Sequence, residues 1–349
     1  MKKKYMLMAL LALTLSLFAG CGAITPETNP ESSEEYGKAD DSITVGFSQL
    51  GAESDWRSAN TDSMLSALSE DNGYSLIYKN GQQKQANQIT AIRTFIQQEV
   101  DYIVLAPATE SGWETVLAEA REAGIPVILV DRRVNTSDKN LYSCWVGSDF
   151  ELEGQKMAAW IKAFTEEKGI AAQDLHIVNI QGSEGSTAQI GRTRGLANAA
   201  RDNGWDLRAE ISGDFTENRG REVMAALLKR FDDINVVYCE NDNMAIGAID
   251  AIESAGKKVG SNIQKGEIMI VSFDGVNETA LEYAREGKIS CIAECNPLHG
   301  PRVSTLIRAI ENGAPYQKFN YVDEKLFSAE LSVKEVSVGD TTYPVDNDF

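Results

Sequence analysis

One loop of this chain gathers acids, an arginine and an aromatic residue directly after a short apolar run. The segment 43–57, ITVGFSQLGAESDWR, carries Glu53, Asp55, Trp56 and Arg57 at its end. Carboxylate and guanidinium groups can each make two hydrogen bonds at once, and the flat face of an indole packs well on C–H groups. Side chains of these types, placed so close together, suit a polar, ring-shaped ligand.

The same ending, an apolar run followed by polar residues, recurs along the chain. In open parallel sheets ligands bind beyond the carboxyl ends of the strands, so these endings are where a site is expected. Eight such endings, with aromatic residues among them, favour a binding cleft over ordinary loop polarity. They lie at residues 80–83, 107–109, 131–133, 181–183, 212–215, 240–242, 274–275 and Glu294.

The residue types at these endings indicate a sugar. Asp131 lies beside Arg132, which keeps the carboxylate ionised and strengthens its hydrogen bonds to neutral hydroxyls. Trp56 and Phe215 offer flat faces to the C–H side of a sugar ring. Each residue also has a structural interpretation: the aromatic rings can cover the edge of the core, Arg132 can form a solvated ion pair, and Asp214 can cap the following helix.

Motifs of common enzyme classes are missing from the sequence. The segment 182–187, GSEGST, lacks the lysine of a Walker loop and the spacing of G-x-G-x-x-G. There is no G-x-S-x-G motif, and no acid pair stands out as that of a glycosidase. With only His176 and His299 and no C-x-x-C pair, ligands for zinc are few. We expect a binding protein with no cofactor and no metal; a secreted glycosidase is the enzymatic alternative.

Length and charge limit the possible partners. The 349 residues allow two domains or one large α/β domain. Fifty-two carboxylates stand against 33 lysines and arginines, which gives a formal net charge of −19. Such a field repels phosphate backbones, so nucleic acid is not an expected partner. The charge suits a soluble domain outside the cell.

The N-terminus has the pattern of a secretory signal. Lysines at 2–4 precede an apolar run at 6–18 that is too short to span a membrane comfortably. The small residues that follow end at Cys21, as in a bacterial lipoprotein signal, although Phe18 stands where leucine is usual. We expect residues 1–21 to be a lipoprotein signal peptide with Cys21 lipidated; a plain secretory signal is the alternative. Residues 22–42 are polar and predict a flexible linker.

From residue 43 onwards, β-branched runs alternate with stretches of helical spacing. Several runs are continuously apolar, as in strands buried on both faces, so the pattern predicts parallel sheets with helices on both sides. Two series of runs predict two lobes, and the series change near residues 142–150. The runs lie at 43–48, 74–79, 101–106 and 126–131, and then at 174–180, 206–211, 234–239, 268–273 and 288–293.

Four cysteines fall in or beside these predicted strands. Cys291 and Cys295 would be about 13 Å apart on an extended strand, which is too far for a disulfide. Cys144 and Cys239 lie in other runs. We expect all four to be buried free thiols.

Longer motifs make the chain resemble the periplasmic sugar-binding proteins of ABC importers, in the ribose/galactose-type group, and within it the galactofuranose-binding subgroup. The resemblance covers roughly residues 43–325 and implies the type I binding-protein fold. It rests on GFSQLGAESDWR (46–57), NGQQKQANQI (80–89), VDR (130–132), QGSEGSTAQIGRTRG (181–195), SGDFTENRGREVM (212–224), NDNMAIGAI (241–249) and FDG (273–275).

The resemblance also implies a ligand-binding set. One departure from the family pattern is the pair Cys239-Glu240, because a histidine often precedes Asn241. Asp214 and Phe215 join the set through the strand-end argument. The positions that match ligand-contacting residues of the family are Trp56, Arg57, Asp131, Arg132, Arg192, Asn241, Asp274 and Glu294.

As implied by the resemblance, the chain crosses three times between two lobes. Lobe I is expected to comprise residues 43–148 and 295–325, and lobe II residues 149–294 and 326–349. The protein would be a monomer, anchored outside the cytoplasm by its lipid, that captures a monosaccharide and delivers it to an ABC permease. Galactofuranose is the first candidate, and delivery to a membrane sensor kinase is the alternative. The secretory N-terminus excludes a transcriptional repressor with the same sensor fold.

Overall fold

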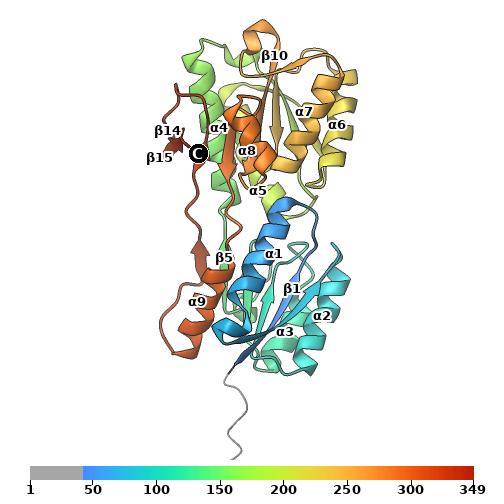
Figure 1. Cartoon of the computed structure of the whole chain (residues 1–349), viewed down its shortest axis with the longest axis vertical. Helices are drawn as coiled ribbons and strands as arrows, with labels where there is room; N and C mark the ends of the chain where they lie inside the picture. The colour runs from blue at the N-terminus through green and yellow to red at the C-terminus, as the bar shows by residue number, and fades with distance from the viewer. Residues whose placement is uncertain (1–41) are drawn as a thin grey trace, which may run out of the picture. The chain divides into compact units, whose positions relative to one another are not determined.

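A computed structural model describes residues 42–349, which form two α/β lobes (Figure 1). Each lobe is built on a largely parallel sheet with helices on both faces. The predicted two-lobed α/β fold is therefore confirmed. The predicted signal peptide, Cys21 and the linker up to residue 41 lie outside the described residues.

The first lobe contains a six-stranded parallel sheet in the order β12-β5-β4-β3-β1-β2. Its central strands β3 and β4, YIVL and VILV, are fully buried, as expected for strands covered on both faces. The strands are β1 (Ile43–Gln49), β2 (Tyr74–Asn80), β3 (Tyr102–Leu105), β4 (Val127–Val130), β5 (Cys144–Gly147) and β12 (Phe319–Tyr321).

Four helices cover the two faces of this sheet. Helices α2 (Gln85–Gln97) and α3 (Glu114–Glu122) contribute apolar residues to the core on one face. Helices α1 (Asp55–Ala67) and α9 (Gly300–Glu311) contribute to the core on the other face. The site-bearing loop 50–54 therefore joins a buried central strand to a helix packed on the same sheet, which fixes its position.

The second lobe contains a nine-stranded sheet in the order β14-β15-β13-β11-β10-β8-β6-β7, with β9 paired to β10. The contacts from β7 to β11 are parallel, whereas β13 is antiparallel to β11, and β14 to β15. The strands are β6 (His176–Gln181), β7 (Asp206–Ser212), β8 (Val236–Cys239), β9 (Lys258–Val259), β10 (Glu267–Asp274), β11 (Cys291–Glu294), β13 (Leu326–Phe327), β14 (Glu335–Val338) and β15 (Thr341–Asp346).

Helices α4 (Phe150–Glu167) and α5 (Thr187–Asn203) pack on one face of the second sheet. Helices α6 (Glu217–Arg230), α7 (Asp242–Ser254) and α8 (Glu278–Arg285) pack on the other. Side-chain caps close many of the helix starts, because the first backbone N–H groups of a helix have no partner inside it. These caps are Ser54 for α1, Asp149 for α4, Ser186 for α5, Thr216 for α6, Asn241 for α7 and Asn277 for α8.

The chain passes between the two sheets three times. It leaves the first sheet after β5, returns after β11 to form α9 and β12, and crosses again before β13 (Figure 1). Each predicted run overlaps a strand, but β5, β9 and β12 to β15 correspond to no predicted run. Strand β12 is a short edge strand with Phe319 and Tyr321 exposed, and β13 has two residues, so neither produces a clear hydrophobic pattern.

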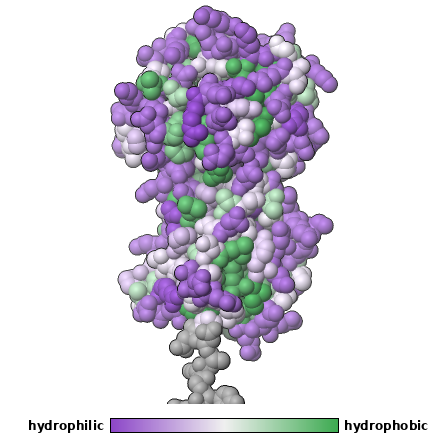
Figure 2. All heavy atoms as spheres, viewed as in Figure 1, coloured by the Kyte–Doolittle hydropathy of each residue, from purple (hydrophilic) through white to green (hydrophobic). Residues whose placement is uncertain are grey.

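The four cysteines within residues 42–349 are buried and form no disulfide. In this part of the chain, every helix is too short or too polar to cross a membrane. The face seen in Figure 2 is mainly hydrophilic, with separate hydrophobic patches on both lobes.

Candidate ligand-binding site

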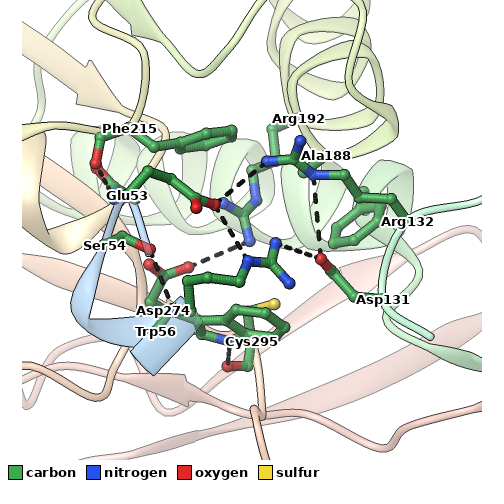
Figure 3. A pocket seen from close by; sticks show the side chains of 13 residues that line it. Glu53, Ser54, Trp56, Asp131, Arg132, Ala188, Arg192, Phe215, Asp274 and Cys295 are labelled. Atoms are coloured by element: carbon green, nitrogen blue, oxygen red, sulfur yellow. Dashed lines mark hydrogen bonds and ion pairs between the residues drawn. The ribbon is translucent and has the colours of Figure 1, made fainter. Parts of the chain in front are cut away.

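A small cavity lies where the strand ends of the two lobes meet. The empty space between its lining atoms, open solvent included, is about 290 Å³. Figure 3 shows arginine and acidic side chains that converge on it from opposite sides. The lining residues are Glu53, Ser54, Trp56, Arg57, Asp131, Arg132, Phe150, Ala188, Arg192, Phe215, Asn241, Asp274 and Cys295.

The first-lobe wall is a network of buried charges. Arg57 pairs with Asp131 (Nη2 to Oδ2, 2.5 Å) and with Glu53 (Nε to Oε1, 3.1 Å). Arg132 Nη2 lies 3.7 Å from the same Glu53 oxygen. Burial would raise the pKa of Asp131, but Arg57 and Arg132 outweigh it and hold this pKa below its ordinary value. Asp131 is therefore an ionised hydrogen-bond acceptor.

Two polar atoms of this wall are buried without a hydrogen-bond partner among residues 42–349. They are Oε2 of Glu53, an acceptor, and Nε of Arg132, a donor. Leaving such atoms unpaired costs about 1–3 kcal/mol each, and more for charged groups. A hydroxyl both donates and accepts, so a hydroxylated ligand in the cavity can satisfy both kinds of atom.

The second-lobe wall centres on Arg192 of α5. Its Nε donates to Glu153 (2.7 Å), its Nη1 to the backbone oxygen of Glu240, and its Nη2 lies 3.4 Å from Asp274 Oδ1. Burial raises the pKa of Asp274 well above its ordinary value, although Arg192 opposes the shift. These three contacts fix the position of the Arg192 guanidinium.

Asp242 fixes the turn that carries Asp274. Its Oδ2 accepts from the backbone N–H groups of Gly275 (3.0 Å) and Val276 (3.1 Å), and its Oδ1 accepts from Ser272 Oγ (2.7 Å). Burial raises the pKa of Asp242 to about 6 despite these hydrogen bonds.

Glu240 belongs to the pair Cys239-Glu240 that departs from the family pattern. Its side chain is buried and does not line the cavity. Its carboxylate accepts from Gly182 N (2.8 Å) and Asn179 Nδ2 (3.1 Å), and burial raises its pKa to about 7. A Cβ on Gly182 would lie 1.9 Å from the Phe215 ring, so only glycine allows this packing. Glu240 therefore supports the loop on which Phe215 rests.

Three lining residues have a backbone conformation that side chains seldom adopt. The φ angles are +62° at Asp131, +60° at Phe215 and +101° at Asp274. Non-glycine residues in this region are strained, and such strain clusters at ligand sites. The fold maintains these conformations at three strand ends that face one cavity.

Aromatic residues close the cavity from both lobes. Trp56 belongs to the first lobe, yet it is buried within the second-lobe core cluster and donates from Nε1 to the Cys295 oxygen (2.6 Å). The Arg132 guanidinium lies over the Phe215 ring at 5.5 Å. Asn241 donates to the Phe215 oxygen (3.0 Å) while capping α7. Trp56 and Phe215 therefore both pack in the core and line the cavity.

Eight of the ten predicted ligand-binding residues line the cavity, and two do not. Asp214 is exposed and accepts from Ser212 Oγ, and Thr216 rather than Asp214 caps α6. Glu294 turns away towards Asn296 and Lys325. The lining residues absent from the predicted set are Glu53, Ser54, Phe150, Ala188 and Cys295.

A model described as "Periplasmic binding protein domain" matches residues 45–299, which is more than half of the chain. The chain belongs to this periplasmic binding protein family. The galactofuranose-binding protein YtfQ of Escherichia coli is 37% identical over 300 residues, covering 84% of this chain and 90% of YtfQ.

Two solved structures of sugar complexes are also similar to this periplasmic binding protein. One, from Mycobacterium smegmatis, contains β-D-fucofuranose; it has a TM-score of 0.77 and 38% identity, covering 83% of this chain and 93% of its own. The other, an arabinose ABC transporter component from Shewanella, contains L-arabinofuranose; it has a TM-score of 0.76 and 34% identity, covering 83% and 93%.

The resemblance inferred from the motifs is therefore confirmed. The expectation of a binding protein rather than an enzyme is also confirmed, since the family is one of periplasmic binding proteins and YtfQ and the Shewanella protein are sugar-binding proteins.

Proposed function

We propose that this periplasmic binding protein captures an uncharged monosaccharide in its five-membered ring form, with galactofuranose as the first candidate. The observation that carries the proposal is the cavity of about 290 Å³, lined by three arginines, three carboxylates and three aromatic rings from two lobes. These side chains supply both hydrogen-bond donors and acceptors, as the hydroxyl groups of a neutral sugar require. The furanose complexes of related proteins support the ring form.

Eight residues are proposed to hold the sugar. In the first lobe, the buried pair of Arg57 and Asp131, with Arg132, would bind adjacent hydroxyls. From the second lobe, Arg192 and Asp274 would bind the opposite edge of the ring. Trp56, Phe215 and Asn241 complete these eight. Glu53, which was not in the predicted ligand-binding set, adds a further acceptor.

The two lobes are proposed to be residues 43–148 with 295–325, and residues 149–294 with 326–349. A sugar that touches both lobes binds the closed arrangement better than the open one, so it shifts the population towards closure. The closed form would then be recognised by an ABC permease. Relatives named as fructose and ribose import binding proteins support transport as the purpose.

The N-terminal part of the proposal is a lipid anchor. The signal peptide would be cleaved before Cys21, which would become the lipidated N-terminus, and residues 22–42 would link the lipid to the folded lobes. Metabolic labelling with a palmitate analogue, compared between wild type and Cys21→Ala, tests this step. Loss of label in the variant is expected, and equal labelling would overturn the proposed anchor.

Titration calorimetry and thermal unfolding test the proposed ligand class. The panel comprises D-galactose, L-arabinose, D-ribose and D-fructose, with galacturonate and galactosamine as charged analogues of galactose. We expect at least one neutral sugar to bind with micromolar or tighter affinity and the charged analogues to bind more weakly. No heat and no thermal shift with any sugar would refute the proposal.

A further inference from the structure

The three segments that connect the lobes meet at one carboxyl group beside the cavity. Oε1 of Glu324, in the third segment, accepts from Ser148 Oγ in the first (2.6 Å) and from Asn296 N in the second (2.7 Å). Lys156 of α4 donates to the backbone oxygen of Glu324 (2.8 Å). Glu324 therefore holds together all three segments about which the lobes would move.

A second carboxyl group joins this junction to the sugar cavity. Glu153 accepts from Arg192 Nε through Oε2 (2.7 Å), while its Oε1 is buried without a hydrogen-bond partner among residues 42–349. The side chain of Glu153 is 2% exposed. Carboxylate oxygens of Glu153 and Glu324 and the sulfur of Cys295 all lie within 4.8 Å of one another.

Two carboxylates so close together in a low-dielectric site cannot both ionise without a large cost. Burial raises the pKa of Glu324 well above its ordinary value, and Glu153 raises it further. Burial also raises the pKa of Glu153, but Arg192 opposes this shift, so the ion pair favours the negative charge on Glu153 rather than on Glu324. The other charged or titratable groups facing the pair are Lys156, Asp274, Glu294, Cys295 and Asp323.

The hydrogen bonds of Glu324 indicate where the proton is held. Oε1 already accepts two hydrogen bonds, which leaves the second oxygen to carry the proton. A protonated carboxyl or the Cys295 thiol can then donate towards the unpaired oxygen of Glu153, so the buried acceptor becomes satisfied. A second ionised carboxylate in the same place would instead repel Glu153.

We infer that Glu153 is a positioning residue for Arg192, and that Glu324 holds a proton beside it at the crossing of the three connecting segments. Sugar capture is thereby linked to protonation at the hinge. The link to sugar affinity rests on the proposed function, whereas the proton on Glu324 does not.

The effect on stability has a definite sign. Because the pKa of Glu324 is raised by folding, its contribution to stability is full below its unfolded pKa, about 4.3, and is lost as the pH rises through the folded pKa. Glu324→Gln keeps the shape and removes the ionisation. Relative to this variant, wild type should lose stability between pH 5 and pH 8.

Thermal unfolding without sugar tests the proton. Wild type, Glu324→Gln and the control Glu282→Gln, an exposed glutamate of α8, are unfolded across this pH range. We expect the control to follow wild type and Glu324→Gln to lose less of its melting temperature as the pH rises. Parallel curves for all three would overturn the inference. A rise in the wild-type melting temperature with zinc chloride, absent in Cys295→Ser, would also overturn it by revealing a metal site.

The positioning role is tested with the neutral sugar that binds best in the panel above. Glu153→Gln should weaken binding at least about tenfold, and Glu324→Gln should flatten the pH dependence of the dissociation constant. If Glu153→Gln does not fold, the Glu324→Gln pH profile alone decides. An unchanged profile would overturn the link. Failure of every sugar to bind would refute the proposed function. The thermal unfolding experiment would still test the proton on Glu324, because it uses no sugar.

Discussion

Arg57 and Arg132 are held in the cavity wall before any ligand arrives. Arg57 is fixed by Asp131 and Glu53, and Arg132 lies over Phe215 and near the same glutamate. Side chains fixed in this way lose little conformational entropy on binding, so each hydrogen bond to a sugar hydroxyl contributes more.

Arg57→Ala and Arg132→Ala should each weaken sugar binding by at least about 1.5 kcal/mol, the scale for losing a charged hydrogen bond. Titration calorimetry measures the loss. Arg93→Ala is the matched control, because Arg93 of α2 forms an exposed ion pair with Glu119 of α3 in the same lobe. If both cavity variants bind like the control, the site has been misplaced.

At this scale the sequence predicted residue types well and side-chain directions poorly. Glu294 and Cys295 are neighbours at the end of β11, where successive side chains point to opposite sides, and Cys295 is the one that lines the cavity. Asp214 and Phe215 are likewise adjacent, and positive φ angles turn Phe215 inward. Glu53 was left out of the predicted ligand-binding set, because its contact with Arg132 from another strand end forms only in the folded chain.

At the scale of elements, the starts of three helices meet across the two lobes. Asp55, the first residue of α1, accepts from Asn243 of α7 (3.0 Å) and from Asn277, the cap of α8, and its backbone N–H donates back to Asn243 (3.3 Å). A carboxylate is favoured at helix N-termini. These contacts join the lobes without lining the cavity.

Asp55→Ala should therefore weaken sugar binding by making closure less favourable. The contacts are exposed, so the expected loss is about 0.5–1 kcal/mol. Distance measurements between spin labels on the two lobes should report a larger open fraction at subsaturating sugar. Asp62→Ala, at an exposed position of the same helix, is the control, and identical behaviour of the two variants would contradict a role in closure.

His299 lies where α9 packs on α1. Its Nδ1 is 3.2 Å from the Asn60 amide nitrogen, so it accepts a hydrogen bond as neutral imidazole. Burial lowers its pKa to about 4. Since the unfolded pKa is about 6.5, its contribution to stability is present above about pH 6.5 and is lost as the pH falls towards 4.

Chemical unfolding at several pH values checks this sign. Wild type should lose up to about 3 kcal/mol through His299 between pH 6.5 and pH 4, and His299→Asn should remove most of that pH dependence. His176→Asn, a half-buried histidine of the second lobe, should retain it. An equal slope in wild type and His299→Asn would show that His299 does not titrate as its burial requires.

At the scale of the whole molecule, the alternation of apolar runs and helical spacing was enough to predict two parallel-sheet lobes. The runs coincide with β1 to β4, β6 to β8, β10 and β11 because central strands are buried on both faces. The three crossings could not be derived in this way. They depend on β12, a three-residue strand at a sheet edge, and on β13, which has two residues, and strands this short show no hydrophobic period.

The two lobes form one binding unit because residues from each complete the cavity wall of the other. Trp56 of the first lobe packs among second-lobe residues, and Cys295 of the second connecting segment accepts its hydrogen bond. The proposed capture mechanism follows from this arrangement: a ligand that contacts both walls stabilises the closed form, and one that contacts a single wall does not.

The central claim is that this cavity holds a monosaccharide in its furanose form. The most direct measurement is the ¹³C NMR spectrum of D-galactose labelled at its anomeric carbon and bound to the protein. The account predicts a bound signal at the chemical shift of a furanose anomeric carbon, and this signal should be weaker in Arg57→Ala at a subsaturating sugar concentration. A bound signal at the pyranose position, or no bound signal at saturating galactose, would contradict it.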